Sequence, residues 1–93
     1  MTAQELVIDT INRNRTILGI PQDESITPTT LLFGENGILD SLNLVHLIVE
    51  LEKDVQRLLQ KQVILADVKA FSAKKSPFKS VEALTNFIEE SLR

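Results

Sequence analysis

The chain has 93 residues, a formal net charge of −3 and a hydrophobic content of 43%. This length suits one small domain and the composition supports a buried core, so we expect a single domain over residues 1–93. The absence of cysteine excludes disulfide bonds and a thiol of the chain's own, and a single histidine argues against a multi-ligand zinc site. The pI of about 5.0 and the 4% aromatic content disfavour nucleic-acid binding.

No stretch of the sequence is hydrophobic over the length needed to cross a bilayer. The N-terminal residues MTAQELVIDTINRNR do not read as a secretory signal, because acidic residues interrupt them and no basic region precedes a hydrophobic core. We therefore expect a cytoplasmic protein without membrane insertion.

The first helix is expected to begin at Thr2. Thr2 and Glu5 form a Thr-x-x-Glu capping-box pattern, in which each side chain satisfies a free backbone amide at the helix start. Hydrophobic residues then recur at helical spacing, namely Leu6, Val7, Ile11 and Leu18. Gly19 and Pro21 predict the end of this helix, because glycine readily takes a left-handed cap and proline cannot continue a helix.

Residues 21–39 are expected to form a long loop. Its hydrophobic residues are Ile26, Leu31, Leu32, Phe33, Ile38 and Leu39. These are too many to leave in water, so we expect the loop to pack over the helices. Loops of this length without structure of their own are uncommon and often carry function.

The longest predicted helix runs over residues 41–59. Asp40 is its expected N-cap, and Leu39 and Leu44 fit a hydrophobic staple across the helix start. The hydrophobic positions of the helix are Leu42, Leu44, Val45, Leu47, Ile48, Val49, Leu51 and Val55. A band this broad predicts a helix that packs on more than one side.

Two more helical segments complete the prediction. A short turn is expected at Ala66–Ser72, and a final helix is expected to start after the cap candidate Ser80. Its hydrophobic face would consist of Val81, Leu84, Ile88 and Leu92. Three longer helices, one short helix and no β-type alternation predict an all-α four-helix bundle, with the long loop between its first two helices.

Ser41 lies at the start of the longest helix. The first amides of a helix lack internal partners and carry partial positive charge, so a phosphate ester on Ser41 would be stabilised there. Gly34 and Gly37 in the preceding loop would leave the hydroxyl accessible. A catalytic serine needs a nearby base, but His46 diverges from Ser41 by roughly 140° around the helix, which disfavours a hydrolase. A serine that only helps to start the helix remains an alternative.

The segment GILDSLNLVHLIVELEKDV, residues 37–55, resembles the core of the acyl and peptidyl carrier proteins, and the resemblance extends from the first helix to FIEESL near the end. It implies a freestanding carrier domain of the acyl-carrier fold, whose Ser41 bears 4′-phosphopantetheine. A phosphopantetheinyl transferase would move this group from coenzyme A onto Ser41. Loading ligases and downstream pathway enzymes would attach and process acyl, aminoacyl or peptidyl thioesters. The carrier, expected to be a monomer, would itself catalyse no reaction.

The resemblance also implies which residues meet partner enzymes, namely Asp40, Leu42, Asn43, Glu50 and Glu52. Asp40 and Leu42 flank the serine. The glutamates lie on a helix whose acidic residues commonly face basic partners, and such complementarity steers encounter. The same resemblance assigns Val45, Val49, Leu84 and Ile88 to the core.

Some residues depart from the pattern of fatty-acid carriers. Asn43 stands where many of them have an acidic residue, His46 and Lys53 dilute the acidic face, and residues 57–79 are rich in lysine. We therefore hypothesise a carrier for a specialised pathway, while fatty-acid, polyketide and amino-acid cargo all stay open. The alternative is an unmodified helical protein-interaction module that binds through the 41–59 helix or the basic segment.

Overall fold

The computed structural model describes residues 2–34, 36–62 and 78–92. Within these ranges the chain forms α1 (Ala3–Arg13), α2 (Arg15–Leu18), α3 (Ser41–Leu59) and α5 (Val81–Ser91). The same ranges contain an isolated bridge between Leu31 and Ser80 but no strand, which confirms the all-α prediction for them. The expected turn at Ala66–Ser72 lies outside the described residues. None of the described helices is long and hydrophobic enough to cross a membrane.

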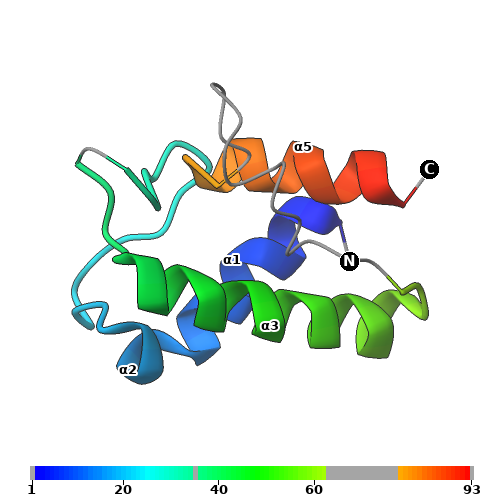
Figure 1. Ribbon diagram of the computed structural model, residues 1–93, viewed down its shortest axis with the longest axis horizontal. Helices are drawn as coiled ribbons and strands as arrows, with labels where there is room; N and C mark the ends of the chain where they lie inside the picture. Colours follow the sequence, from blue (N-terminus) through cyan, green and yellow to red (C-terminus); the bar gives the residue numbers. More distant parts are fainter. Residues whose placement is uncertain (1, 35, 63–77, 93) are drawn as a thin grey trace.

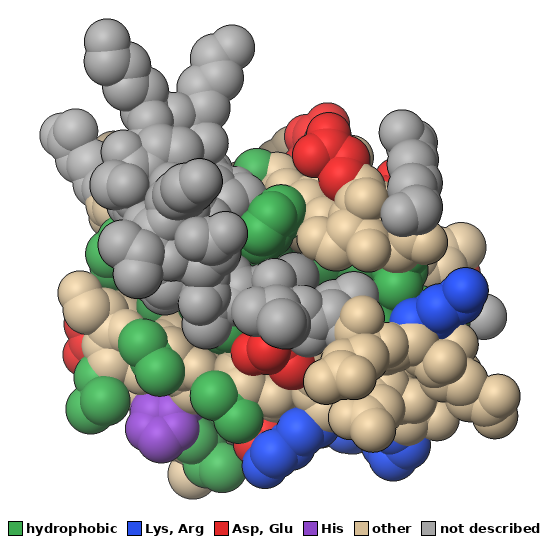
Figure 2. Space-filling model, turned by 45° about the vertical axis from the view of Figure 1, so that its right-hand side comes forward, with side chains coloured by type: hydrophobic (Ala, Val, Ile, Leu, Met, Phe, Trp, Pro, Cys, Tyr) green, Lys and Arg blue, Asp and Glu red, His purple; other side chains and the backbone are tan. Residues whose placement is uncertain are grey.

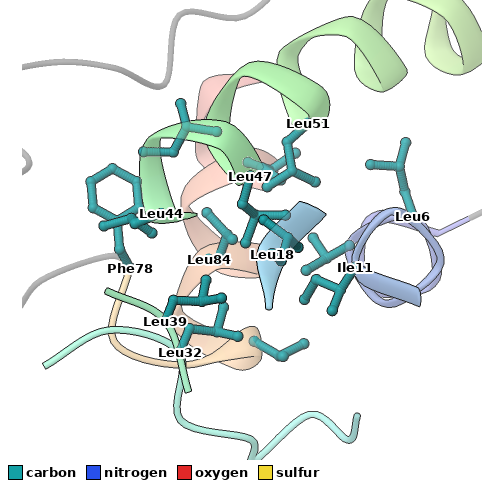
Figure 3. Close-up of a cluster of buried hydrophobic side chains, with 14 of the residues drawn as sticks. Leu6, Ile11, Leu18, Leu32, Leu39, Leu44, Leu47, Leu51, Phe78 and Leu84 are labelled. Atoms are coloured by element: carbon teal, nitrogen blue, oxygen red, sulfur yellow. The ribbon is translucent and has the colours of Figure 1, made fainter. Parts of the chain in front are cut away.

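Helix α1 is central to the arrangement. It packs against both α3 and α5, and the short α2 packs against α3 (Figure 1). These helices enclose one hydrophobic core (Figure 3). Its fully buried large side chains are Leu6, Ile11, Leu18, Leu32, Leu44, Leu47, Ile48, Leu51, Phe78, Leu84 and Ile88. Since burying each such side chain stabilises the fold by about 1.5–3 kcal/mol, this core is the main source of stability.

The N-terminal helical region differs from the prediction at one point. A single helix up to Leu18 was expected, but Asn14 leaves the helical conformation (φ −116°, ψ 20°) and separates α1 from α2. The predicted positions of the ends are confirmed, but the capping box forms only in part, because the Glu5 carboxylate accepts the Thr2 hydroxyl at 3.1 Å instead of the Thr2 N–H. The Thr2 hydroxyl oxygen accepts the Glu5 N–H at 3.1 Å, and Gly19 ends α2 in the left-handed conformation (φ 69°).

The long loop packs onto the core, as the sequence predicts. Leu32 and Leu39 are buried, and Ile26, Phe33 and Ile38 are partly buried against the same cluster. The backbone of the loop also makes two hydrogen bonds at Leu32. The Leu32 N–H donates to the Lys79 carbonyl at 2.7 Å, and the Leu39 N–H donates to the Leu32 carbonyl at 2.8 Å. Through these hydrogen bonds the loop links the residues just before α3 to those just before α5.

Helix α5 begins as predicted. The Ser80 hydroxyl oxygen accepts the Ala83 N–H at 3.1 Å and caps the helix. The rings of Phe78 and Phe87 meet edge to face with centroids 5.8 Å apart. Both phenylalanines therefore pack at the core, Phe78 fully buried and Phe87 partly buried.

The packing of α3 corrects part of the prediction. Leu84 and Ile88 are buried as expected, but Val45 is 48% exposed and Val49 is 43% exposed. The broad hydrophobic band predicted packing on more than one side. In the structure the buried residues of α3 face α1 and the core, whereas Val45 and Val49 lie on the outer side of the helix, at the edge of the band.

Asp54 joins α3 to α1. Its side chain is 7% exposed and accepts hydrogen bonds from the Thr10 hydroxyl at 2.6 Å and from the guanidinium groups of Arg13 and Arg57. Burial raises the pKa of Asp54, but these donors outweigh burial and leave the pKa below its ordinary value. In the sequence Asp54 is one of several acidic residues before position 56, and nothing there indicates these partners.

Candidate functional site

The start of α3 is held by Asp40. Its carboxylate oxygen Oδ1 accepts the Asn43 N–H at 2.8 Å, and its carbonyl accepts the Leu44 N–H at 2.9 Å. Asp40 itself has the extended conformation that an N-cap requires (φ −84°, ψ 179°). The predicted cap is therefore confirmed. Because Asp40 performs this role, the Ser41 hydroxyl is not needed to start the helix.

Ser41 is the first residue of α3, and its side chain is exposed. Over the part of the chain that the structure describes, its hydroxyl makes no hydrogen bond, and the N–H groups of Ser41 and Leu42 also lack protein partners. Free amides at a helix start attract negative charge. The arrangement therefore presents an accessible hydroxyl beside two free donors suited to a phosphate.

His46 does not assist Ser41 in this structure. Both side chains are exposed, and five positions of an α-helix separate them by roughly 140°. Among the described residues, neither an imidazole nor a carboxylate is hydrogen-bonded to the Ser41 hydroxyl. In the described residues the Ser41 hydroxyl therefore has no base in hydrogen-bond contact, which an activated serine nucleophile would need.

An exposed hydrophobic strip follows Ser41 along α3. It consists of Leu42 (67% exposed), Val45 (48%) and Val49 (43%), which we call the α3 strip. The spacing of three and four residues keeps these side chains on one side of the helix. Figure 2 shows hydrophobic side chains gathered beside the histidine on this surface. Contiguous exposed hydrophobic side chains often mark interaction sites.

The sequence assigned only part of this strip to a site. Leu42 was predicted to meet partners, whereas Val45 and Val49 were assigned to the core. A signal was present, because the hydrophobic band of residues 41–59 is wider than one buried face needs. The sequence could not show which edge of that band would remain exposed.

The other predicted recognition residues are scattered around α3. Glu50 and Glu52 are both partly buried and lie about 200° apart around the helix, so they do not form one acidic face. The Glu50 carboxylate also pairs with Lys53, with 3.6 Å between Oε1 and Nζ. Asn43 is partly buried, and its amide nitrogen lies near Gly19 at the end of α2. Only Asp40 and Leu42 accompany Ser41 on the exposed surface at the helix start.

Comparisons with protein-family models, with curated proteins and with solved structures found no match for this chain. The described residues also contain no cluster of histidine, aspartate or glutamate side chains suited to holding a metal ion. A functional proposal therefore depends on the motif around Ser41 and on the geometry of the α3 start.

Proposed function

We propose that this protein is a carrier that holds acyl, aminoacyl or peptidyl intermediates as thioesters on 4′-phosphopantetheine attached to Ser41. The observation that carries the proposal is the Ser41 hydroxyl, which is exposed at the first residue of α3 and is released from capping by Asp40. The Asp-Ser-Leu motif at residues 40–42 and the all-α fold support the same proposal. The acyl-carrier type of bundle is part of what we propose.

The residues at the α3 start fit this prosthetic group. Its phosphate would lie at the positive end of the α3 dipole, where the N–H groups of Ser41 and Leu42 are free to donate. The group supplies a thiol, which the chain lacks because it has no cysteine. Asp40 keeps the helix start in place, so the attachment point keeps its position when the arm moves between enzymes.

The α3 strip is the surface we propose for partner enzymes. Leu42, Val45 and Val49 would enter a hydrophobic depression on a partner, next to the arm on Ser41. The partners would be a phosphopantetheinyl transferase, a loading ligase and the later enzymes of a specialised cytoplasmic pathway. Glu50 pairs with Lys53, and Glu52 lies on the opposite side of α3. Hydrophobic contact, rather than an acidic face, would therefore hold the partner enzymes.

Intact-mass measurement tests the proposal. The purified protein is incubated with coenzyme A and a broad-range phosphopantetheinyl transferase. We expect a mass gain of one phosphopantetheine for the wild type and for Ser25→Ala, a control at another exposed serine. Ser41→Ala should remain folded by circular dichroism and gain nothing. A well-folded wild-type protein that gains no mass would refute the carrier proposal.

An unmodified interaction module is the second candidate, because the α3 strip is exposed whether or not Ser41 is modified. The same measurement separates the candidates. A module would show no mass gain, and a partner would bind Ser41→Ala as tightly as the wild type while losing affinity for Leu42→Ala.

A further inference from the structure

The backbone around Leu32, within the long loop, is hydrogen-bonded to two other segments of the chain. On one side the Leu32 N–H donates to the Lys79 carbonyl at 2.7 Å, and the Val81 N–H donates to the Thr30 carbonyl at 3.0 Å. On the other side the Leu32 carbonyl accepts the Leu39 N–H at 2.8 Å. Leu39 lies two residues before Ser41. The backbone at Leu32 therefore links the fixed start of α5 to the residues that lead into α3.

Gly37 lies directly against this backbone. A Cβ atom at position 37 would be 2.6 Å from the Leu32 carbonyl oxygen, 2.7 Å from the Leu32 carbonyl carbon and 2.9 Å from the Phe33 nitrogen. These distances are too short for non-bonded atoms, and all three atoms belong to the backbone, so the clash cannot be relieved by turning a side chain. Only glycine, which has no Cβ atom, fits at position 37 this close to the Leu32 backbone.

The atom that a side chain at position 37 would meet first is the Leu32 carbonyl oxygen. The same oxygen accepts the Leu39 N–H, and both Leu32 and Leu39 are buried. A side chain at position 37 would therefore disturb the hydrogen bond that holds the residues leading to Asp40 and Ser41.

We propose that Gly37 is a positioning residue: by leaving the Leu32–Leu39 hydrogen bond intact, it holds the residues that lead into α3 and keeps Ser41 in the first turn of that helix, where the helix sets the hydroxyl relative to the α3 strip. The inference rests on the proposed carrier function. An enzyme that docks on the strip and transfers a group to Ser41 needs the two at a fixed separation, because small misplacements of a reacting atom cost much of the rate. Contacts with Leu42, Val45 and Val49 would set how tightly the enzyme binds, whereas the position of the hydroxyl would set how fast the group is transferred.

Transferase kinetics on Gly37→Ala test the proposal. We expect kcat for arm transfer to fall by about 10- to 100-fold, with KM within about twofold because the α3 strip is intact. Leu42→Ala should show the opposite pattern, a raised KM with little change in kcat. Asn36→Gly is the neighbouring control. Asn36 already has a positive φ of 65°, so glycine there adds no clash and should leave both constants unchanged.

A second control separates positioning from a general loss of stability. Thr10→Val removes the hydrogen bond from Thr10 to Asp54, which joins α1 to α3 and involves no loop residue, so we expect it to lower the melting temperature. Each variant is assayed well below its own melting temperature. A kcat for Gly37→Ala equal to that of Thr10→Val would overturn the inference while leaving the carrier function intact. A wild-type protein that accepts no arm would overturn both.

Amide hydrogen exchange in the wild type provides a test that needs no variant. We expect the Leu39 and Leu32 amides to be protected, since both are bonded within the loop. A Leu39 amide that exchanges as fast as an unstructured one would show that this loop does not position Ser41, and the inference would fail.

Discussion

Replacing Asp54 by asparagine measures how strongly α1 and α3 are joined. The carboxylate accepts the Thr10 hydroxyl at 2.6 Å and guanidinium groups from Arg13 and Arg57. Hydrogen bonds to charged groups are worth about 1.5–3 kcal/mol each. Arg13 and Arg57 have side chains 43% and 59% exposed, so they can be rehydrated when released. Asparagine still accepts from Thr10, and the expected net cost is therefore about 2 kcal/mol.

Thermal unfolding across pH is the assay for Asp54. A loss of about 2 kcal/mol lowers the melting temperature of a domain this size by roughly 10 °C. The folded-state pKa of Asp54 is below its ordinary value. Asp54 thus stabilises the fold fully above about pH 4, which is the pKa of an aspartate in the unfolded chain. The stabilisation is lost as the pH falls through the lower pKa that Asp54 has in the folded protein. The gap between wild type and Asp54→Asn should close in that acidic range.

Asp9→Asn is the matched control for this experiment. Asp9 also pairs with Arg13, at 2.8 Å, but its side chain is 44% exposed, so its loss should cost less than about 0.5 kcal/mol. If Asp54→Asn melts within about 2 °C of the wild type at pH 7, far less than that expected shift, or if its deficit is unchanged in acid, the reasoning about the buried carboxylate is wrong.

Two further predictions concern the α3 start and the α3 strip. Asp40→Ala should cost about 1 kcal/mol as a lost N-cap, while Ser41→Ala should change the free energy of unfolding by less than about 0.5 kcal/mol; urea unfolding showing the reverse order would assign the cap to Ser41. Leu42→Ala and Val49→Ala should also stay within about 0.5 kcal/mol of the wild type because both side chains are exposed, whereas Leu47→Ala should cost about 2–5 kcal/mol. Equal losses at Val49 and Leu47 would show that the strip is covered in solution.

Local signals in the sequence were sufficient for the helix ends. Thr2, Asp40, Ser80 and Gly19 all cap helices as predicted. A cap depends on the side chain or φ angle of one residue and on amides within the next turn, so the information lies within a few positions. For the same reason the motif at residues 40–42 located Ser41 at the first residue of α3.

The surroundings of Ser41 depend on residues far apart in the chain. Val45 and Val49 have the same hydrophobic character as buried positions, and only the way α1 and α2 pack against α3 decides that they stay exposed. Asp54 lies 44 positions from Thr10, and Gly37 is constrained by a Leu32 carbonyl that is itself held at the start of α5. The sequence by itself therefore determined where the helices start and end, because those choices are made by neighbouring residues. The tertiary structure alone decided which face of α3 is open and how the loop before Asp40 is held, because those contacts form only when distant segments meet.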